Sequence, residues 1–321
     1  YPDCSPEYTA MLGSAIATCI SDIPFDGPCA TTQIGMIGGE FIVNPTNSQK
    51  TDSDLALTVA STREKVIMIE AGAKEIPEQV MIEAIFKAHE VNQEIIKFID
   101  RIVAECGKPK HSYESCAVSP ELLSAIQEIV PSAEMENAVF TDDKQTREEN
   151  IRRITEKLEA AFADKEEWLA GLGEAVYQYQ KKTVRKMILR DHKRPDGRAV
   201  TEIRPLAAEI DLLPRVHGSG MFTRGQTQIL NVCTLAPMSE AQRLDGLDEN
   251  ETSKRYMHHY NFPSYSVGET KPSRGPGRRE IGHGALAERA LVPVLPTEAE
   301  FPYAIRTVSE TMESNGSTSQ A

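Results

Sequence analysis

The order of secondary-structure patterns along the 321-residue chain constrains its fold more than any other feature. Clustered Val, Ile and Leu residues, which are typical of strands, occur before residue 70 and again after residue 206. Between residues 119 and 193 the apolar residues follow helical spacing alone. Because helices and sheets bury their apolar faces in separate layers, this order predicts a small all-α module between two α/β pieces.

The first α/β piece is expected to contain a hairpin and a long amphipathic helix. Gly38 and Gly39 separate two strand patterns by two residues, which is the spacing of a tight hairpin turn. Gly107 and Pro109 mark the end of the long helix. The predicted elements are helices over 8–22 and 78–106 and strands over 32–37, 40–44, 55–60 and 65–69. This piece is therefore α/β in character.

The helical module and the second α/β piece carry their own start and stop signals. Ser119 followed by Pro120 predicts an N-cap with proline at the first helical position, and Thr141 predicts the cap of the next helix. The predicted elements are helices beginning at 120 and spanning 141–163, 166–189 and 282–292, strands over 207–213, 220–223, 227–235 and 302–310, and a polar loop over 238–255. The strand patterns thus return only after the helical module.

Charge and composition restrict the class of protein. The net charge is −13, but the segment from Lys181 to Arg198 contains eight basic residues and only two acidic ones. This segment is either a solvated helix face or a contact with nucleic-acid phosphates. No run reaches the roughly 20 apolar residues that a membrane span needs. The six cysteines form no C-x-x-C pair, so neither a zinc site nor a disulfide framework is expected, and the predicted compartment is the cytoplasm.

A cluster of hydroxyl side chains follows the last predicted strand. Ser317, Thr318 and Ser319 come directly after Gly316. A strand-to-helix turn of this kind can hold a phosphate with its backbone N–H groups and hydroxyls, although a serine-rich helix cap has the same sequence. Taken alone, the cluster does not decide between the two.

Three basic residues near position 280 are further candidates. Arg278 and Arg279 carry forked donors that suit phosphate oxygens, and an adjacent arginine pair in a Gly/Pro-rich segment also fits a solvated surface. His283 either donates a hydrogen bond to a bound ligand or braces the loop. Upstream, Arg224 is expected to pair with Glu280 or Glu313 in a structural role.

Aromatic residues precede these candidates. They fit either base stacking, as in single-strand binding, or core packing, which is favoured here. The residues are Tyr260, Phe262 and Tyr265. The neighbouring His258 and His259 lack the carboxylate spacing of a metal site.

Five short motifs occur together in a fixed order. They are RPDGR at 194–198, FTRG at 222–225, YNFP followed by SVGET at 260–270, GRREIGHG at 277–284 and ESNGSTS at 313–319. In this order they resemble the bacterial-type polynucleotide phosphorylase family, in which two RNase PH-like cores flank an all-helical domain. The resemblance implies a partial chain: the C-terminal half of the first core (1–110), the helical linker domain (111–193) and the N-terminal half of the second core (194–321).

The resemblance also implies a function. The family degrades single-stranded RNA from the 3′ end with inorganic phosphate as the attacking group, reversibly, and assembles as a homotrimer. It implies that Ser317, Thr318 and Ser319 bind phosphate, although the family commonly has Ser in place of Thr318. Arg278, Arg279 and His283 are implied to contact RNA or phosphate. The first core, whose strand ends in Asn-Pro-Thr at 44–46, is expected to be non-catalytic.

The resemblance further implies Mg²⁺ as a cofactor, with its acidic ligands expected beyond Ala321, so no catalytic residue is assigned in this chain. A weakly active or inactive fragment is therefore expected, and a non-catalytic RNA-binding or assembly piece is the alternative. A metabolic α/β enzyme with a coincidental phosphate loop is disfavoured, because the chain lacks both a G-x-G-x-x-G motif and a P-loop lysine.

Overall fold

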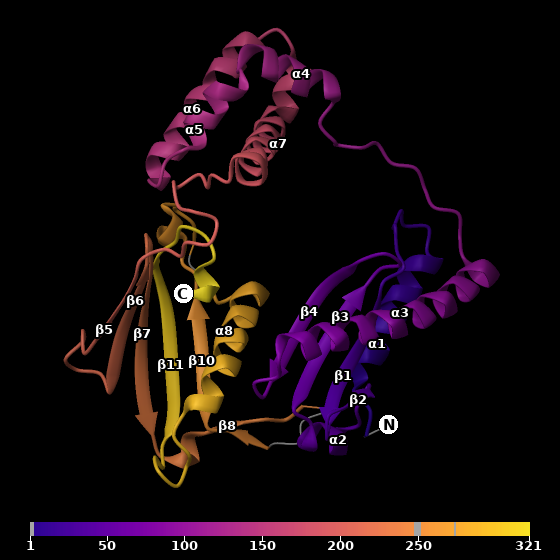
Figure 1. Cartoon of the computed structure of the whole chain (residues 1–321), viewed down its shortest axis with the longest axis vertical. Coiled ribbons are helices and arrows are strands. Elements are labelled where there is room, and N and C mark those ends of the chain that lie inside the picture. The colour runs from indigo at the N-terminus through magenta and orange to yellow at the C-terminus, as the bar shows by residue number, and fades with distance from the viewer. Residues whose placement is uncertain (1–2, 247–251, 273) are drawn as a thin grey trace. The chain divides into compact units, whose positions relative to one another are not determined.

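A computed structural model of the chain describes residues 3–246, 252–272 and 274–321 and divides it into two compact units, each described by itself (Figure 1). Unit one comprises Tyr1–Tyr113, Leu235–Met257 and Ala285–Arg306. Unit two comprises Glu114–Thr234, His258–Gly284 and Thr307–Ala321. Among the described residues, no helix combines the length and the apolar composition that crossing a membrane requires.

The N-terminal part of unit one contains an antiparallel sheet with the strand order β2-β1-β3-β4. Its strands are β1 (Ala30–Ile37), β2 (Glu40–Val43), β3 (Leu55–Ser61) and β4 (Val66–Ala73). Ile37 pairs with Glu40 across the turn, where Gly38 and Gly39 have φ angles of 60° and 86°. Positive φ at both positions suits glycine, so the predicted hairpin is confirmed.

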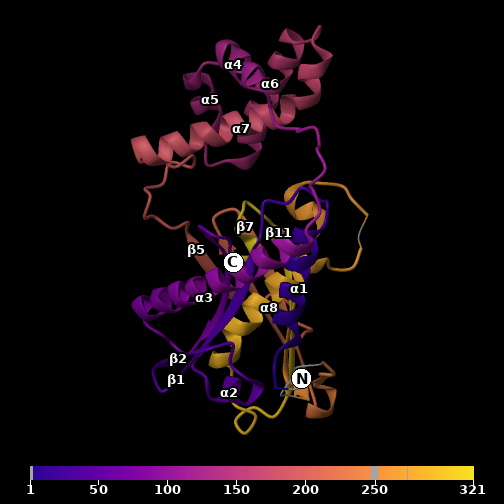
Figure 2. The same ribbon diagram turned by 90° about the vertical axis from the view of Figure 1, so that its right-hand side faces the viewer.

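Helix α3 (Glu78–Cys106) covers this sheet and has the predicted bounds. Ala84 and Ala88 on its buried face pack against strand residues such as Leu57, and farther along α3 Ile99 contacts α1 (Pro6–Ile20). The two helices lie side by side in Figure 2. Small residues on the buried face of α3 allow this close packing. The apolar spacing predicts a different face in part, because Phe86 is 66% exposed.

A short helix, α2 (Asn47–Asp52), was not predicted. Thr46 and Gln49 form a capping box, in which the Thr46 side chain accepts from the Gln49 N–H and the Gln49 side chain accepts from the Thr46 N–H. Six residues are too few to show helical periodicity, so only the local capping signal could have indicated this helix.

The helical part of unit two forms a bundle with one shared apolar core, which includes Ile126, Met135, Leu158 and Leu172. Its helices are α4 (Pro120–Ile129), α5 (Ser132–Val139), α6 (Lys144–Ala161) and α7 (Glu166–Asp191). The Ser119 hydroxyl accepts from the Leu122 N–H at 3.1 Å, which confirms that N-cap. Helix α5 was not predicted as a separate element, because eight residues after Pro131 give only two turns.

The predicted cap at Thr141 is wrong. Asp143 caps α6 instead, since its Oδ1 accepts from the Thr146 N–H at 2.7 Å. The Thr141 hydroxyl accepts instead from the N–H of the N-cap residue Asp143 itself, at 3.2 Å. Asp is the stronger N-cap residue, and its carboxylate also favours the positive end of the helix.

A second sheet has the strand order β10-β11-β7-β6-β5. Its strands are β5 (Leu206–Ile210), β6 (Gly218–Arg224), β7 (Thr227–Ala236), β10 (Tyr256–Asn261) and β11 (Ala304–Glu313). The segment predicted as a polar loop also holds the short paired strands β8 (Gln242–Arg243) and β9 (Ser253–Lys254). Single turns of 3₁₀ helix occur at Met238–Glu240, Ser264–Val267, Val292–Val294 and Thr318–Gln320.

Helix α8 (Arg278–Leu291) begins four residues before the predicted start at Gly282. The Glu280 carboxylate accepts from the Gly277 N–H at 3.0 Å, which satisfies one of the free N–H groups at the helix start. The earlier start places Arg278 and Arg279 in the first turn of a helix rather than in a loop. Gly284 lets α8 approach β10, because a Cβ atom there would lie 3.2 Å from the His258 carbonyl oxygen.

Candidate active site

A pocket of about 330 Å³ in unit two collects most of the candidate residues. It is formed by the end of β10, the first turns of α8 and the loop after β11. Its lining residues are Tyr260, Phe262, Arg279, Glu280, His283, Ser314, Gly316, Ser317, Thr318 and Ser319. Residues 314–319 are called the hydroxyl loop below. Side chains separated by up to about 60 positions in the sequence thus share one cavity.

The hydroxyl loop turns sharply at Gly316 and Ser317. Gly316 has φ 80°, and Ser317 has φ 53° and ψ 40°, a left-handed conformation that is strained for a residue with a Cβ atom. The Ser314 and Thr318 hydroxyls are buried and hydrogen-bond each other. Ser317 is exposed and Ser319 is half-buried, so their hydroxyls lie at the pocket wall while that of Thr318 is engaged within the loop.

The hydroxyl loop ends in a single helical turn. Thr318–Gln320 forms one 3₁₀ turn, and the helix predicted to follow the hydroxyl cluster stays a prediction. Gly316 and Ser317, directly before this turn, have successive positive φ angles. Successive N–H groups in such a turn form a concavity that can bind an anion.

Helix α8 separates the two adjacent arginines. Arg279 and His283 are four residues apart, so they share one helix face and both line the pocket. Arg278, one position earlier, is exposed and does not line it. Among the described residues, the buried Nδ1 atom of His283 has no hydrogen-bond partner.

The aromatic residues divide between the core and the surface. Tyr260 is 7% exposed and meets His283 edge-on, with 5.4 Å between ring centroids. Burial raises the pKa of the Tyr260 phenol, a shift that the positive charge of Arg279 opposes, so the hydroxyl stays neutral. Tyr265 is 53% exposed, and its hydroxyl donates to Glu310 at 3.2 Å. Core packing therefore describes Tyr260 but not Tyr265.

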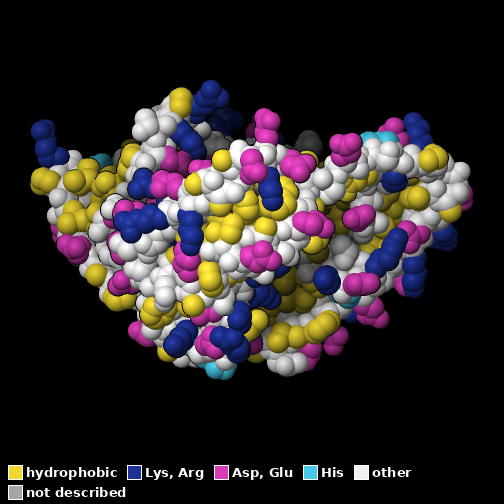
Figure 3. Space-filling model, turned by 90° about the horizontal axis from the view of Figure 1, so that it is seen from above, with side chains coloured by type: hydrophobic (Ala, Val, Ile, Leu, Met, Phe, Trp, Pro, Cys, Tyr) yellow, Lys and Arg dark blue, Asp and Glu magenta, His cyan; other side chains and the backbone are white. Residues whose placement is uncertain are grey.

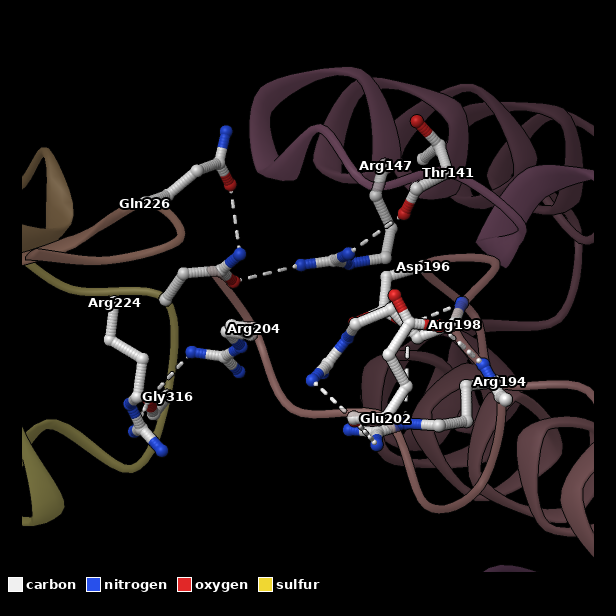
Figure 4. A network of polar contacts seen from close by, with 12 residues as sticks. Thr141, Arg147, Arg194, Asp196, Arg198, Glu202, Arg204, Arg224, Gln226 and Gly316 are labelled. Carbon is white, nitrogen blue, oxygen red and sulfur yellow. Dashed lines mark hydrogen bonds and ion pairs between the residues drawn. The ribbon is translucent and has the colours of Figure 1, made fainter. Parts of the chain in front are cut away.

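Two arginines hold the back of the hydroxyl loop (Figure 4). Arg224 donates to the carbonyl oxygens of Ser317 at 2.5 Å and Gly316 at 3.5 Å, not to Glu280 or Glu313 as expected. Arg204 donates to the Gly316 carbonyl oxygen at 3.3 Å. Burial, together with the neighbouring charge of Arg224, lowers the pKa of Arg204. The structural role expected for Arg224 is thus present with different partners.

Sequence patterns gave no signal for Arg204, which lies outside the recognised motifs. Its role depends on a contact 112 positions away in the chain. Basic and acidic side chains are interspersed over the face that Figure 3 presents.

Three family models match successive parts of the chain. Residues 27–91 match the 3′ exoribonuclease family, domain 2, and residues 202–321 match domain 1 of the same family. Residues 121–199 match the RNA-binding domain of polyribonucleotide nucleotidyltransferase. All the lining residues of the pocket fall within the domain 1 match.

Curated relatives match along the whole chain. It is 76% identical to the polyribonucleotide nucleotidyltransferase of Lachnoclostridium phytofermentans over 321 residues, which is 100% of this chain and 46% of that protein. The chain belongs to the polyribonucleotide nucleotidyltransferase family. Family members of the same name from Ruminiclostridium cellulolyticum and Bacillus cytotoxicus are 53% and 52% identical, each over 99% of this chain and 45% of their own length. The chain thus spans about half the length of the curated relatives it matches.

Membership in the polyribonucleotide nucleotidyltransferase family confirms the resemblance and the fold class. RNase PH-like α/β segments flank an all-helical segment, in the predicted order. The structure brings Arg279, His283 and the hydroxyl loop into one pocket and leaves Arg278 outside it. The roles of these residues in binding stay predictions.

Proposed function

We propose that the protein is a phosphate-dependent 3′→5′ exoribonuclease that acts on single-stranded RNA. An oxygen of inorganic phosphate attacks the phosphorus of the 3′-terminal phosphodiester, and the bond to the 3′ oxygen of the preceding nucleotide breaks. That 3′ oxygen takes up a proton, and the released product is a nucleoside diphosphate. The same steps in reverse extend RNA from nucleoside diphosphates.

The observation that supports this proposal is the composition of the pocket. Ser317 and Ser319 supply hydroxyls, the turn at Gly316 supplies backbone N–H groups, and Arg279 supplies a forked cation. Such a set suits a phosphate ion beside a phosphodiester, because catalysis of phosphoryl transfer depends on positioning and on neutralising developing charge.

Individual roles follow from position. Ser317 and Ser319 bind the attacking phosphate, and Thr318 supports them through its hydrogen bond to Ser314. Arg279 binds the charge shared by phosphate and scissile phosphodiester. His283 donates a hydrogen bond to RNA from the same helix face. Arg278, outside the pocket, contacts the RNA backbone upstream of the reacting bond.

The proposal includes Mg²⁺ as cofactor. Within the described residues, no three His, Cys, Asp or Glu side chains are grouped so that they could hold a metal ion. The residues present therefore do not fit a cation site, and no step of the reaction is assigned to the cation.

The proposal extends to organisation. Residues 1–110 form the C-terminal half of a first RNase PH-like core, residues 111–193 the linker domain and residues 194–321 the N-terminal half of a second core. The protein acts in the cytoplasm as a homotrimer.

Phosphate dependence tests the proposed function. The full-length protein is expected to release nucleoside diphosphates from an oligoadenylate in the presence of phosphate and Mg²⁺. Replacing phosphate with sulfate at equal ionic strength should stop the release, because sulfate offers no attacking oxygen of comparable nucleophilicity. Chromatographic identification of the products measures this. Nucleoside monophosphates would indicate hydrolysis and contradict the proposal, and RNA binding without any release would favour a non-catalytic role.

A further inference from the structure

The helical bundle contacts the hydroxyl loop directly, although the two are far apart in the sequence. In the first turn of α6, the Lys144 ammonium donates to the Ser314 carbonyl oxygen at 3.5 Å, across 170 positions. The Arg147 guanidinium donates to Asn315 Oδ1 at 3.3 Å. All these residues belong to unit two. The pocket wall is thus connected to a helix that contributes no lining residue.

The backbone N–H and both side-chain groups of Asn315 form hydrogen bonds with residues that do not line the pocket. Its backbone N–H donates to the buried Thr227 hydroxyl at 3.1 Å, and its Nδ2 donates to Gln226 Oε1 at 2.8 Å. Gln226 in turn donates from Nε2 to Asp143 Oδ2 at 3.4 Å. Asp143 is the N-cap of α6 and Arg147 lies in its first turn, so the bonds close a ring through Gln226 and Asn315. Figure 4 shows Gln226 and Arg147 of this ring.

Cationic side chains outside this ring also hold three carbonyl oxygens of the hydroxyl loop. The carbonyl oxygens of Ser314, Gly316 and Ser317 accept from Lys144, Arg204 and Arg224. A carbonyl oxygen turned toward the pocket would repel a phosphate, whereas an N–H group attracts it. The hydrogen bonds from these cations to the carbonyl oxygens therefore favour the conformation in which backbone N–H groups, and not carbonyl oxygens, face the pocket.

We propose that Arg147 and Asn315 are positioning residues, which hold the hydroxyl loop in its anion-binding conformation and so make phosphate affinity depend on the helical domain. This inference rests on the proposed function, since phosphate is the anion in question. The left-handed conformation of Ser317 persists only where its surroundings determine it. Arg224 holds the Ser317 carbonyl oxygen, and the ring holds Asn315 two positions earlier. Loss of the ring shifts the loop without removing a group that touches substrate.

The test is a separation of kinetic constants in the full-length protein. Arg147→Ala is expected to raise the KM for phosphate about tenfold, with the KM for RNA and kcat at saturating phosphate within about twofold of the unmodified protein. Arg147→Lys, which keeps the charge but not the fork, should recover part of the affinity. Arg152→Ala is the matched control, because Arg152 lies on the same helix with its side chain 67% exposed and should leave every constant unchanged.

A second variant breaks the same ring at another residue, in case Arg147→Ala fails to fold. Gln226→Ala removes the bridge from the β6–β7 turn and should raise the KM for phosphate about threefold. An unchanged KM for phosphate in both variants overturns the inference, as does an equal rise in the KM for RNA, which would mark an RNA contact.

Phosphate-induced thermal stabilisation separates this inference from the proposed function. Phosphate should raise the Tm of the unmodified protein, and Arg147→Ala should reduce that shift. If the unmodified protein shows no phosphorolysis, the proposed function fails, while a reduced shift still supports the positioning role. An equal shift in both proteins overturns the positioning role whatever the activity.

Discussion

Arg279→Ala is expected to lower kcat/KM for phosphorolysis by about 10- to 100-fold, whereas Arg278→Ala lowers it by less than about fivefold. A hydrogen bond to a charged group contributes about 1.5–3 kcal/mol, which corresponds to that range of rates. Both arginines are exposed, but Arg279 lines the pocket beside the hydroxyl loop and Arg278 does not. Steady-state kinetics at varied phosphate and RNA concentrations measures both variants.

The adjacent arginine is itself the matched control. Both variants lose one positive charge from the first turn of α8, so long-range electrostatic effects and any change in helix stability are nearly equal. A difference between them reports contact with the reacting groups. Equal losses in the two variants would show that general attraction of RNA, and not the pocket, explains the role of the pair. Arg279→Lys should retain only part of the activity, because one ammonium cannot replace a fork.

Sequence patterns predicted the parts of the fold whose signals are long or local. Helix α3 shows 29 residues of helical spacing, and the hairpin at Gly38 has a two-residue turn that admits one register. Helices α2 and α5 are too short for periodicity to identify. The start of α8 was placed late because Glu280 satisfies the Gly277 N–H in a segment whose glycines and prolines indicate a loop.

Only the residues of the candidate site that lie within recognisable motifs could be predicted from the sequence. The hydroxyl loop and the GRREIGHG motif carry their own chemistry, so their residues were identified without knowledge of their proximity. Only the observed helix shows that Arg279 lines the pocket and Arg278 does not. The sequence motif could not distinguish the two arginines, because this segment was predicted to be a loop. The contacts of Lys144 and Arg147 join elements about 170 positions apart and follow from packing alone. Their surroundings in sequence, rich in charged residues, indicate only an exposed helix.

Asn92→Leu is expected to destabilise the N-terminal α/β part of unit one by about 4 kcal/mol. Asn92 lies on α3, is fully buried, and accepts from the Thr32 hydroxyl at 2.8 Å. Its Nδ2 donates to the Ser61 hydroxyl at 2.9 Å and the Val59 carbonyl oxygen at 3.1 Å. Leucine fills a similar volume but leaves the buried Thr32 and Ser61 hydroxyls without their partner, and each such group costs about 1–3 kcal/mol.

Hydrogen exchange of the β1 and β3 amides measures this loss locally, which matters because a chain with several folded parts does not unfold in one step. Glu94→Leu is the control: it introduces the same side chain on the same helix, but the Glu94 side chain is 72% exposed, so a change within about 0.5 kcal/mol is expected. If Asn92→Leu matched this control, apolar packing alone would account for the contact between α3 and its sheet. A selective loss would instead show that the buried amide joins both strands to the helix, since no apolar residue can bond to Thr32 and Ser61 together.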